Sequence, residues 1–271
     1  AVVFLCSSAL ALLNTHKVLY AIDCGGEGFK TKEGIVFKAD DHYVGGTGSD
    51  FGKSITSFRF ADYEEVYQTE RYDTENFSYM LPLLKDDKYV LVLKFSEVWF
   101  DQEGEKIFSV KLGNRVVVDK LDIFAIVGKN TAYDEFVEFE LKGGKVFYAG
   151  KEAIGAFQDG HLKVEFVKTS KDNPKVNGIM IIKGTKEDTH YTDQQNRLAL
   201  IQRQKAILEN DVFYEAHADD ESDFEEHLGE ARGRADSQNY SSGLVATILM
   251  AVVAAGLWVV KLLMKPKEHR T

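Results

Sequence analysis

Two carboxylates flank a pair of aromatic residues in one segment of the chain, and this combination could act on a sugar or bind one. The segment LKFSEVWFDQ places Glu97 and Asp101 on either side of Trp99 and Phe100. Two carboxylates hydrolyse a glycosidic bond when one protonates the leaving oxygen and the other acts as base or nucleophile. No motif pairs these two as acid and base, so glycoside hydrolysis is the weaker of the two interpretations.

Aromatic rings beside polar groups indicate binding of a carbohydrate instead. Sugars present C–H faces that pack on rings, and hydroxyl groups that pair with carboxylates and amides. Tyr72, Trp99, Phe100 and Asp172 supply both kinds of group. The negative charge of Asp172 would disfavour anionic sugars. A core role for the aromatic residues and a turn-forming role for Asp172, which precedes Asn173 and Pro174, are the alternatives.

Other chemistry finds no support in the sequence. It contains no G-x-S-x-G, H-E-x-x-H, C-x-x-C or Walker motif, and its histidines are scattered. We therefore predict no catalytic residue, no cofactor and no metal site. The formal net charge is -10, with no basic patch before the last few residues, and this excludes nucleic acid as an expected partner.

The elements that would position these residues are strands. Apolar and polar residues alternate in Leu93–Gln102, which predicts a half-buried strand ending on two aromatics that face opposite ways. The same alternation recurs at Phe108–Leu112, Val137–Leu141 and Leu162–Phe166. Gly113-Asn114 and Gly143-Gly144 fall between such segments and predict tight hairpin turns. We predict an all-β fold, an antiparallel β-sandwich over residues 17–184.

The two ends of the chain have a different composition. Residues 1–16 are interpreted as the remnant of a signal peptide, because Val2–Leu13 is apolar and contains an A-x-A sequence. Residues 185–243 are predicted to be a linker, with a modest amphipathic helix over 194–208 and then an acidic, extended stretch. That helix is a stalk, a binding site for a partner or a spacer next to the membrane.

Residues 244–264 are predicted to form one transmembrane helix, followed by a short basic tail over 265–271. The basic residues after the span predict a cytosolic tail and a lumenal domain, as in a type I membrane protein. Asn76 and Asn239 lie in sequons and are candidates for N-glycosylation.

The sequence also resembles the malectin family, in motif order and approximate spacing across the predicted domain. The motifs that carry this resemblance are Ala21–Glu27 (AIDCGGE), Tyr67–Tyr72 (YQTERY), Tyr89–Phe100 (YVLVLKFSEVWF) and Asp172–Val176 (DNPKV). The resemblance implies a jelly-roll-like lectin of the endoplasmic reticulum membrane that is not an enzyme. The implied ligand is glucose-α1,3-glucose on diglucosylated high-mannose N-glycans, bound early in glycoprotein quality control. Ribophorin I of the oligosaccharyltransferase complex is the implied protein partner.

The resemblance places the sugar contacts on Phe51, Tyr72, Trp99, Phe100 and Asp172. The family typically has tyrosine at the positions of Phe51 and Trp99 in this chain. The missing hydroxyl at Phe51 would cost about 0.5 to 1.5 kcal/mol if it bonded to the sugar. Two alternatives to this lectin remain, a glycosidase and a cell-surface adhesion or receptor ectodomain that binds carbohydrate.

Overall fold

The chain folds into two large antiparallel β-sheets. The computed structural model describes residues 17–83 and 85–208. The strands of the first six-stranded sheet follow in the order β1 (Val18–Asp23), β17 (Gly178–Lys183), β8 (Asp87–Phe95), β11 (Tyr133–Lys142), β12 (Lys145–Tyr148) and β13 (Lys151–Glu152). The order in the second is β10 (Arg115–Leu121), β9 (Phe108–Leu112), β15 (His161–Lys168), β7 (Phe77–Pro82) and β4 (Tyr43–Val44), and β14 (Phe157–Gln158) pairs with β15.

Two smaller sheets complete the described β structure. A three-stranded sheet has the order β16 (Lys175–Val176), β6 (Glu70–Tyr72) and β5 (Thr47–Ser49), and a two-stranded one joins β2 (Phe29–Lys30) to β3 (Val36–Phe37). The short helices are η2 (Phe51–Ser54), η3 (Glu65–Tyr67), α1 (Ile123–Val127) and η4 (Lys186–Asp188).

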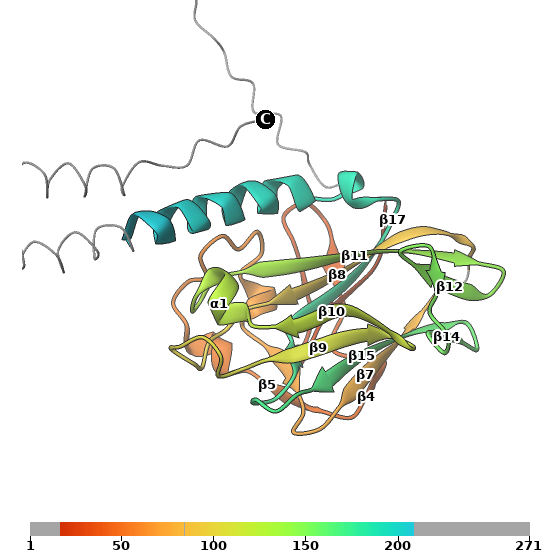
Figure 1. The fold of residues 1–271 in the computed structure, drawn as a ribbon, viewed down its shortest axis with the longest axis horizontal. Coiled ribbons are helices and arrows are strands. Elements are labelled where there is room, and N and C mark those ends of the chain that lie inside the picture. The colour runs from red at the N-terminus through yellow and green to blue at the C-terminus, as the bar shows by residue number, and fades with distance from the viewer. Residues whose placement is uncertain (1–16, 84, 209–271) are drawn as a thin grey trace, which may run out of the picture. The chain divides into compact units, whose positions relative to one another are not determined.

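The main core lies between the two large sheets, which form separate layers in Figure 1. Leu91 and Leu93 of β8 belong to the same buried cluster as Val164 and Phe166 of β15. Burial of these apolar side chains against each other is the main force holding the sheets together. The predicted all-β sandwich is therefore confirmed.

The structure confirms the predicted alternation in β15 and the two predicted hairpin turns. In β15 buried and partly exposed residues alternate, as the spacing of Leu162, Val164 and Phe166 predicts. The two hairpin turns are also confirmed, because Leu112 pairs with Arg115 and Lys142 pairs with Lys145. In the second turn both glycines have positive φ, 59° at Gly143 and 70° at Gly144, and glycine adopts this conformation without steric cost.

The prediction for the segment Leu93–Gln102 was wrong in two respects. Strand β8 ends at Phe95, so Trp99 and Phe100 lie in the turn that follows it. The strand is also buried on both faces: Lys94 is fully buried. A second apolar cluster covers the outer face of the sheet, formed by residues such as Val90 and Val92 with Val66, Tyr67, Met180 and Ile182.

A longer helix follows the last strand. It covers residues 191–208, in agreement with the helix predicted over 194–208, and the compact unit that holds the sheets extends to Arg203. Ile201 is buried in the main core and Leu198 packs against it. Residues 185–203 therefore contribute to the folded unit.

Within 17–83 and 85–208, no helix has the length and apolar character that a bilayer crossing requires. The predicted signal remnant at 1–16, the acidic stretch after 208, the span at 244–264 and the tail at 265–271 lie outside the described residues, as does Asn239.

Candidate functional site

The three-stranded sheet brings three of the five predicted sugar contacts into one region. Tyr72 lies on the middle strand β6, opposite Thr47 of β5 and Lys175 of β16. Phe51 follows β5 by two residues, and Asp172 precedes β16 by three. The backbone N–H of Asp73 donates to the carbonyl of Pro174 over 3.3 Å, which holds the Asp172 loop beside Tyr72.

A buried arginine fixes this sheet to the rest of the domain. The guanidinium of Arg71 donates from Nε to the Asp40 carboxylate over 2.8 Å, and from Nη1 to the carbonyl of Gly46 over 2.6 Å. It also stacks on Tyr43, with its central carbon 3.3 Å from the ring centroid. Because neighbouring side chains on a strand point to opposite faces, the burial of Arg71 turns Tyr72 outward, where it is half-buried.

Two polar side chains connect β16 to the end of β8. The Lys175 ammonium pairs with Glu70 and donates to the carbonyl of Ser96 over 2.6 Å. The Asn177 side chain accepts from the N–H of Ser96 over 3.0 Å. The N–H and the carbonyl of Ser96 are thus both bound by residues that follow the Asp172 loop. These bonds fix the backbone at the start of the turn after β8.

Glu97 and Lys129 hold the backbone of that turn. One oxygen of the Glu97 carboxylate, Oε1, accepts from the N–H of Trp99 over 2.8 Å and from the N–H of Phe100 over 3.1 Å. The Lys129 ammonium donates to the carbonyl of Trp99 over 3.2 Å and to Asp101 over 2.8 Å. Glu97 is buried, with 1% of its surface exposed.

These contacts argue against Glu97 and Asp101 as a hydrolytic pair. The Glu97 oxygen Oε1 is committed to the backbone of the turn, and Asp101 forms an exposed ion pair with Lys129. An acid and a base that cleave a glycoside must both reach the scissile bond from opposite sides. Glu97 serves the shape of the turn instead, and Asp101 forms an ion pair at its surface.

The turn presents Trp99 to solvent beside Phe51. The exposed fractions are 62% for Trp99 and 43% for Phe51. Their ring centroids are 5.0 Å apart with an interplanar angle of 62°, an edge-to-face contact. Large exposed rings that contact one another offer an apolar surface on which a sugar face can pack.

Phe100 belongs to a second group, with Asp172 and a lysine that the sequence did not single out. The Lys106 ammonium is 5.3 Å from the centroid of the Phe100 ring and forms an ion pair with Asp172 Oδ2. Nothing in the sequence pattern distinguishes Lys106, which is 66 positions from Asp172. This ion pair offsets the negative charge of Asp172, so the expected exclusion of anionic sugars by that charge loses its basis.

The structure therefore places the five predicted residues as one contacting pair, one pair joined through a lysine, and one neighbour. Phe51 contacts Trp99, Lys106 joins Phe100 to Asp172, and Tyr72 lies on the strand between the Phe51 and Asp172 segments. Outside this region, Asn76 is exposed and its side-chain oxygen accepts from the N–H of Lys168 over 2.9 Å.

A separate charged cluster lies under the helix at 191–208. Asp134 is buried and accepts from Lys94 over 2.6 Å and from Tyr67 over 2.9 Å, and His190 is 2.7 Å away. Burial raises the pKa of Asp134, but Lys94 and His190 outweigh it, so the pKa lies well below its usual range.

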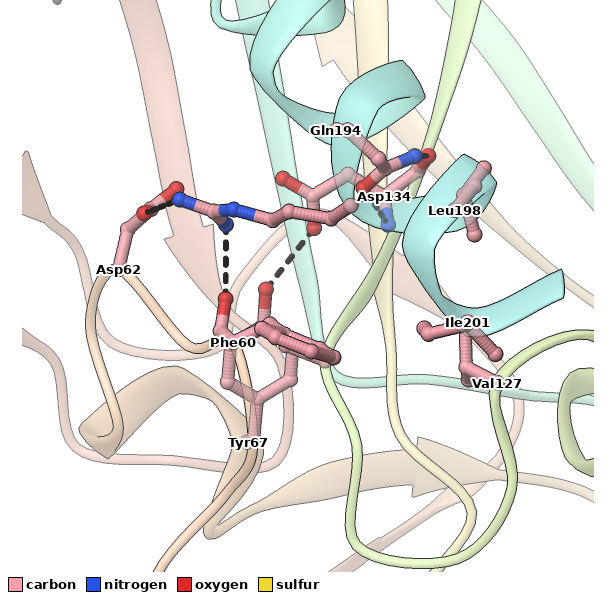
Figure 2. Close-up of a pocket in the computed structure, with 10 residues that line it drawn as sticks. Phe60, Asp62, Tyr67, Val127, Asp134, Gln194, Leu198 and Ile201 are labelled. Carbon is pink, nitrogen blue, oxygen red and sulfur yellow. Dashed lines mark hydrogen bonds and ion pairs between the residues drawn. The ribbon is translucent and has the colours of Figure 1, made fainter. Parts of the chain in front are cut away.

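Figure 2 shows the helix beside Asp134 and Tyr67 of this cluster. Gln194 bonds to the Asp134 backbone, and Arg197 pairs with Asp62 over 2.7 Å and donates to the carbonyl of Phe60. Ile201 lies next to Val127. These contacts join the helix to the domain, at a place distinct from the aromatic turn. Within the described residues no group of three or more His, Cys, Asp or Glu side chains could hold a metal ion.

Comparison with known proteins identifies related sequences and folds. The family model of the Malectin domain matches residues 18–179. Malectin-A of Xenopus laevis is 42% identical over 175 residues, which is 64% of this chain and 62% of that protein. Malectin of Homo sapiens is 41% identical over 176 residues, which is 64% of this chain and 59% of that protein.

A more distant likeness is to the extracellular domain of ANXUR1 from Arabidopsis thaliana. That structure superposes with a TM-score of 0.50 and 15% identity, covering 63% of this chain and 49% of that one. At this identity the likeness concerns the fold alone. The alignments with the curated relatives above span 59% to 62% of their length. The family match covers more than half of this chain and nearly all of the described domain, so the chain belongs to the malectin family.

Proposed function

We propose that this protein is a lectin and not an enzyme, and that it binds glucose-α1,3-glucose on diglucosylated high-mannose N-glycans. The observation that carries the proposal is the pair of exposed rings, Phe51 and Trp99, in edge contact beside the ion-paired Asp172. Membership of the malectin family supports it. Phe51, Tyr72, Trp99 and Phe100 would contact the sugar faces, and Asp172 would accept from sugar hydroxyls.

Recognition on this proposal requires no bond-making step. An apolar sugar face gains contact area on rings that are already exposed, and the backbone that carries Trp99 is held by the contacts of the turn. Asp172 adds direction, because a carboxylate accepts a hydroxyl hydrogen bond more strongly than a neutral group does. The two carboxylates closest to the rings, Glu97 and Asp101, have other partners.

The test is a titration of the purified full chain with the free disaccharide, measured by calorimetry. Trp99→Ala removes an exposed ring at small cost to the fold, and we expect up to about tenfold weaker binding. Asp172→Asn should lower the affinity further, because it removes the charge that strengthens the hydrogen bond from the sugar hydroxyl. The amide still offers an acceptor oxygen to the Lys106 ammonium. The asparagine is preferred to alanine, which would leave the buried Lys106 without its partner.

A glycan array distinguishes this disaccharide from other sugars, and an assay for released glucose tests the glycosidase alternative. Strong binding to a different sugar class would replace the proposed ligand. Turnover of a diglucosylated oligosaccharide would overturn the assignment as a lectin.

We further propose that the domain resides in the lumen of the endoplasmic reticulum, anchored by one span, with ribophorin I as a partner. Exposed Asn76 gives a test of this location. In cells, the wild type should carry an N-glycan that endoglycosidase H removes, and Asn76→Gln should change the glycosylation pattern. Co-purification with ribophorin I tests the partner. A chain that acquires resistant, complex glycans would contradict retention in this compartment.

A further inference from the structure

Lys106 is a charged side chain with unused hydrogen-bonding capacity next to the proposed site. Only 10% of its side chain is exposed, and the Phe100 ring lies 5.3 Å from its ammonium. A lysine ammonium has three N–H donors. Within residues 17–83 and 85–208, the Asp172 carboxylate is the one hydrogen-bond acceptor that this ammonium contacts.

This arrangement leaves the ammonium open to a further acceptor. Removing a charge from water costs free energy unless its hydrogen bonds are replaced, and one carboxylate oxygen replaces only part of them. The partner Asp172 is 32% exposed, so the ion pair opens toward solvent on the side of the carboxylate. A molecule that reaches Asp172 from solvent therefore also comes within reach of Lys106.

The two loops that carry this pair are fixed to one another. The N–H of Asp172 donates to the carbonyl of Glu105, the residue before Lys106, over 3.3 Å. Lys106 itself is close to the start of β9 at Phe108. The donor and the acceptor are thus held in place before any ligand arrives, which lowers the cost of binding.

We propose that Lys106 is a specificity-determining residue that contacts the ligand. Its ammonium donates to a hydroxyl oxygen of the sugar, while Asp172 accepts from the neighbouring hydroxyl. This inference rests on the proposed function and adds the requirement for a pair of adjacent hydroxyls, one acting as acceptor and the other as donor. The pair offers one donor beside one acceptor, so it selects a diol over an isolated hydroxyl.

The test uses the methyl glycoside of glucose-α1,3-glucose and its monodeoxy and monofluoro analogues, titrated against the purified full chain. At the hydroxyl that meets Lys106, fluorine should lower the affinity less than hydrogen does, because fluorine still accepts weakly. At the hydroxyl that donates to Asp172, both replacements should lower it equally.

A variant makes the assignment specific. Lys106→Met should weaken binding of the parent disaccharide about tenfold to a hundredfold, because it removes a hydrogen bond to a charged group. It should cause no further loss with the one deoxy analogue that lacks the hydroxyl facing Lys106. Lys171→Met is the matched control, because Lys171 is exposed and adjacent to Asp172, and it should leave the affinity unchanged.

The outcomes separate this inference from the proposed function. Wild-type affinity in Lys106→Met, or an equal loss for every analogue, overturns the inference and leaves the lectin in place, because Lys106 would then only position Asp172. If Lys106→Met does not fold, the fluorine and hydrogen series on the wild type decides. A wild type that binds no diglucoside refutes the proposed function and this inference together.

Discussion

Glu97 sets the shape of the turn that carries Trp99 and Phe100, and its replacement should disturb both stability and binding. The change is Glu97→Ala. It removes the carboxylate oxygen that accepts from two backbone N–H groups over 2.8 and 3.1 Å. Among residues 17–83 and 85–208, these two N–H groups have no other hydrogen-bond acceptor.

The magnitude follows from these two bonds. A hydrogen bond to a charged group contributes about 1.5 to 3 kcal/mol, which gives an upper limit of about 3 to 6 kcal/mol for the pair. Trp99 is exposed and Phe100 only half-buried, so water can reach the freed N–H groups and recover part of this loss. We expect the unfolding free energy to fall by about 1 to 3 kcal/mol, and affinity for the disaccharide by about tenfold.

The assay is denaturant unfolding of the full chain, combined with calorimetric titration of the disaccharide. Asp101→Asn is the matched control in the same turn, because its ion pair with Lys129 is exposed and should contribute less than about 1 kcal/mol. Glu97→Gln keeps an acceptor oxygen and should fall between the two. If Glu97→Ala matches Asp101→Asn in both measurements, the carboxylate does not set the turn and the argument fails.

Three further predictions concern other parts of the molecule. Trp99→Tyr introduces the tyrosine that the resemblance led us to expect at this position, and it should change affinity for the disaccharide by less than about tenfold, measured by titration. Complete loss would show that the indole is required. Asp134→Asn should destabilise the fold by about 3 to 5 kcal/mol at pH 7, because it leaves Lys94 without its charged partner. The pKa of Asp134 is lowered in the folded state, so its contribution to stability is fully present above the unfolded pKa of about 3.9 and is lost as pH falls below that value. The unfolding free energies of the wild type and Asp134→Asn should therefore converge in acid, and a difference that stays constant with pH would contradict this. Ile201→Ala should cost about 2 to 4 kcal/mol because Ile201 is buried, and exposed Leu200→Ala should cost under about 0.5 kcal/mol; equal melting temperatures would mean that the helix does not contribute to the fold.

Strands with one buried face could be predicted from the sequence because their environment has the same period as the strand. Val164 and Phe166 face the core while Glu165 between them is only partly buried, so the pattern of side chains records the pattern of burial. Turns such as Gly143-Gly144 could also be predicted from the sequence, because a positive φ favours glycine over other residues.

The environment of β8 could not be read in this way. Lys94 occupies a position that alternation assigns to solvent, yet it is fully buried because a second apolar cluster covers that face. Its charge is balanced by Asp134, 40 positions away. A partner so distant leaves no local signal, and a polar residue in an alternating segment therefore suggests exposure when the actual requirement is an ion pair.

In the candidate site, too, some residues could be predicted from the sequence and others could not. The resemblance to the malectin family named the rings and Asp172, and the structure brings Phe51 to Trp99 and joins Phe100 to Asp172. It could not name Lys106 or the role of Glu97. These residues act through contacts between loops and through backbone N–H groups, which have no signature in residue type or spacing.

The exposure of the rings explains why the polar contacts beneath them are needed. A ring that must meet a ligand cannot be held by burial, so Trp99 has to be positioned through its backbone. Glu97 and Lys129 bind the N–H and the carbonyl of Trp99, while Lys175 and Asn177 bind both backbone groups of Ser96 at the start of the turn. Apolar residues at these four positions would bury more surface but would leave the turn free to relax. These polar side chains thus give the backbone beneath Trp99 and Phe100 a fixed position, and binding need not supply the free energy for ordering it.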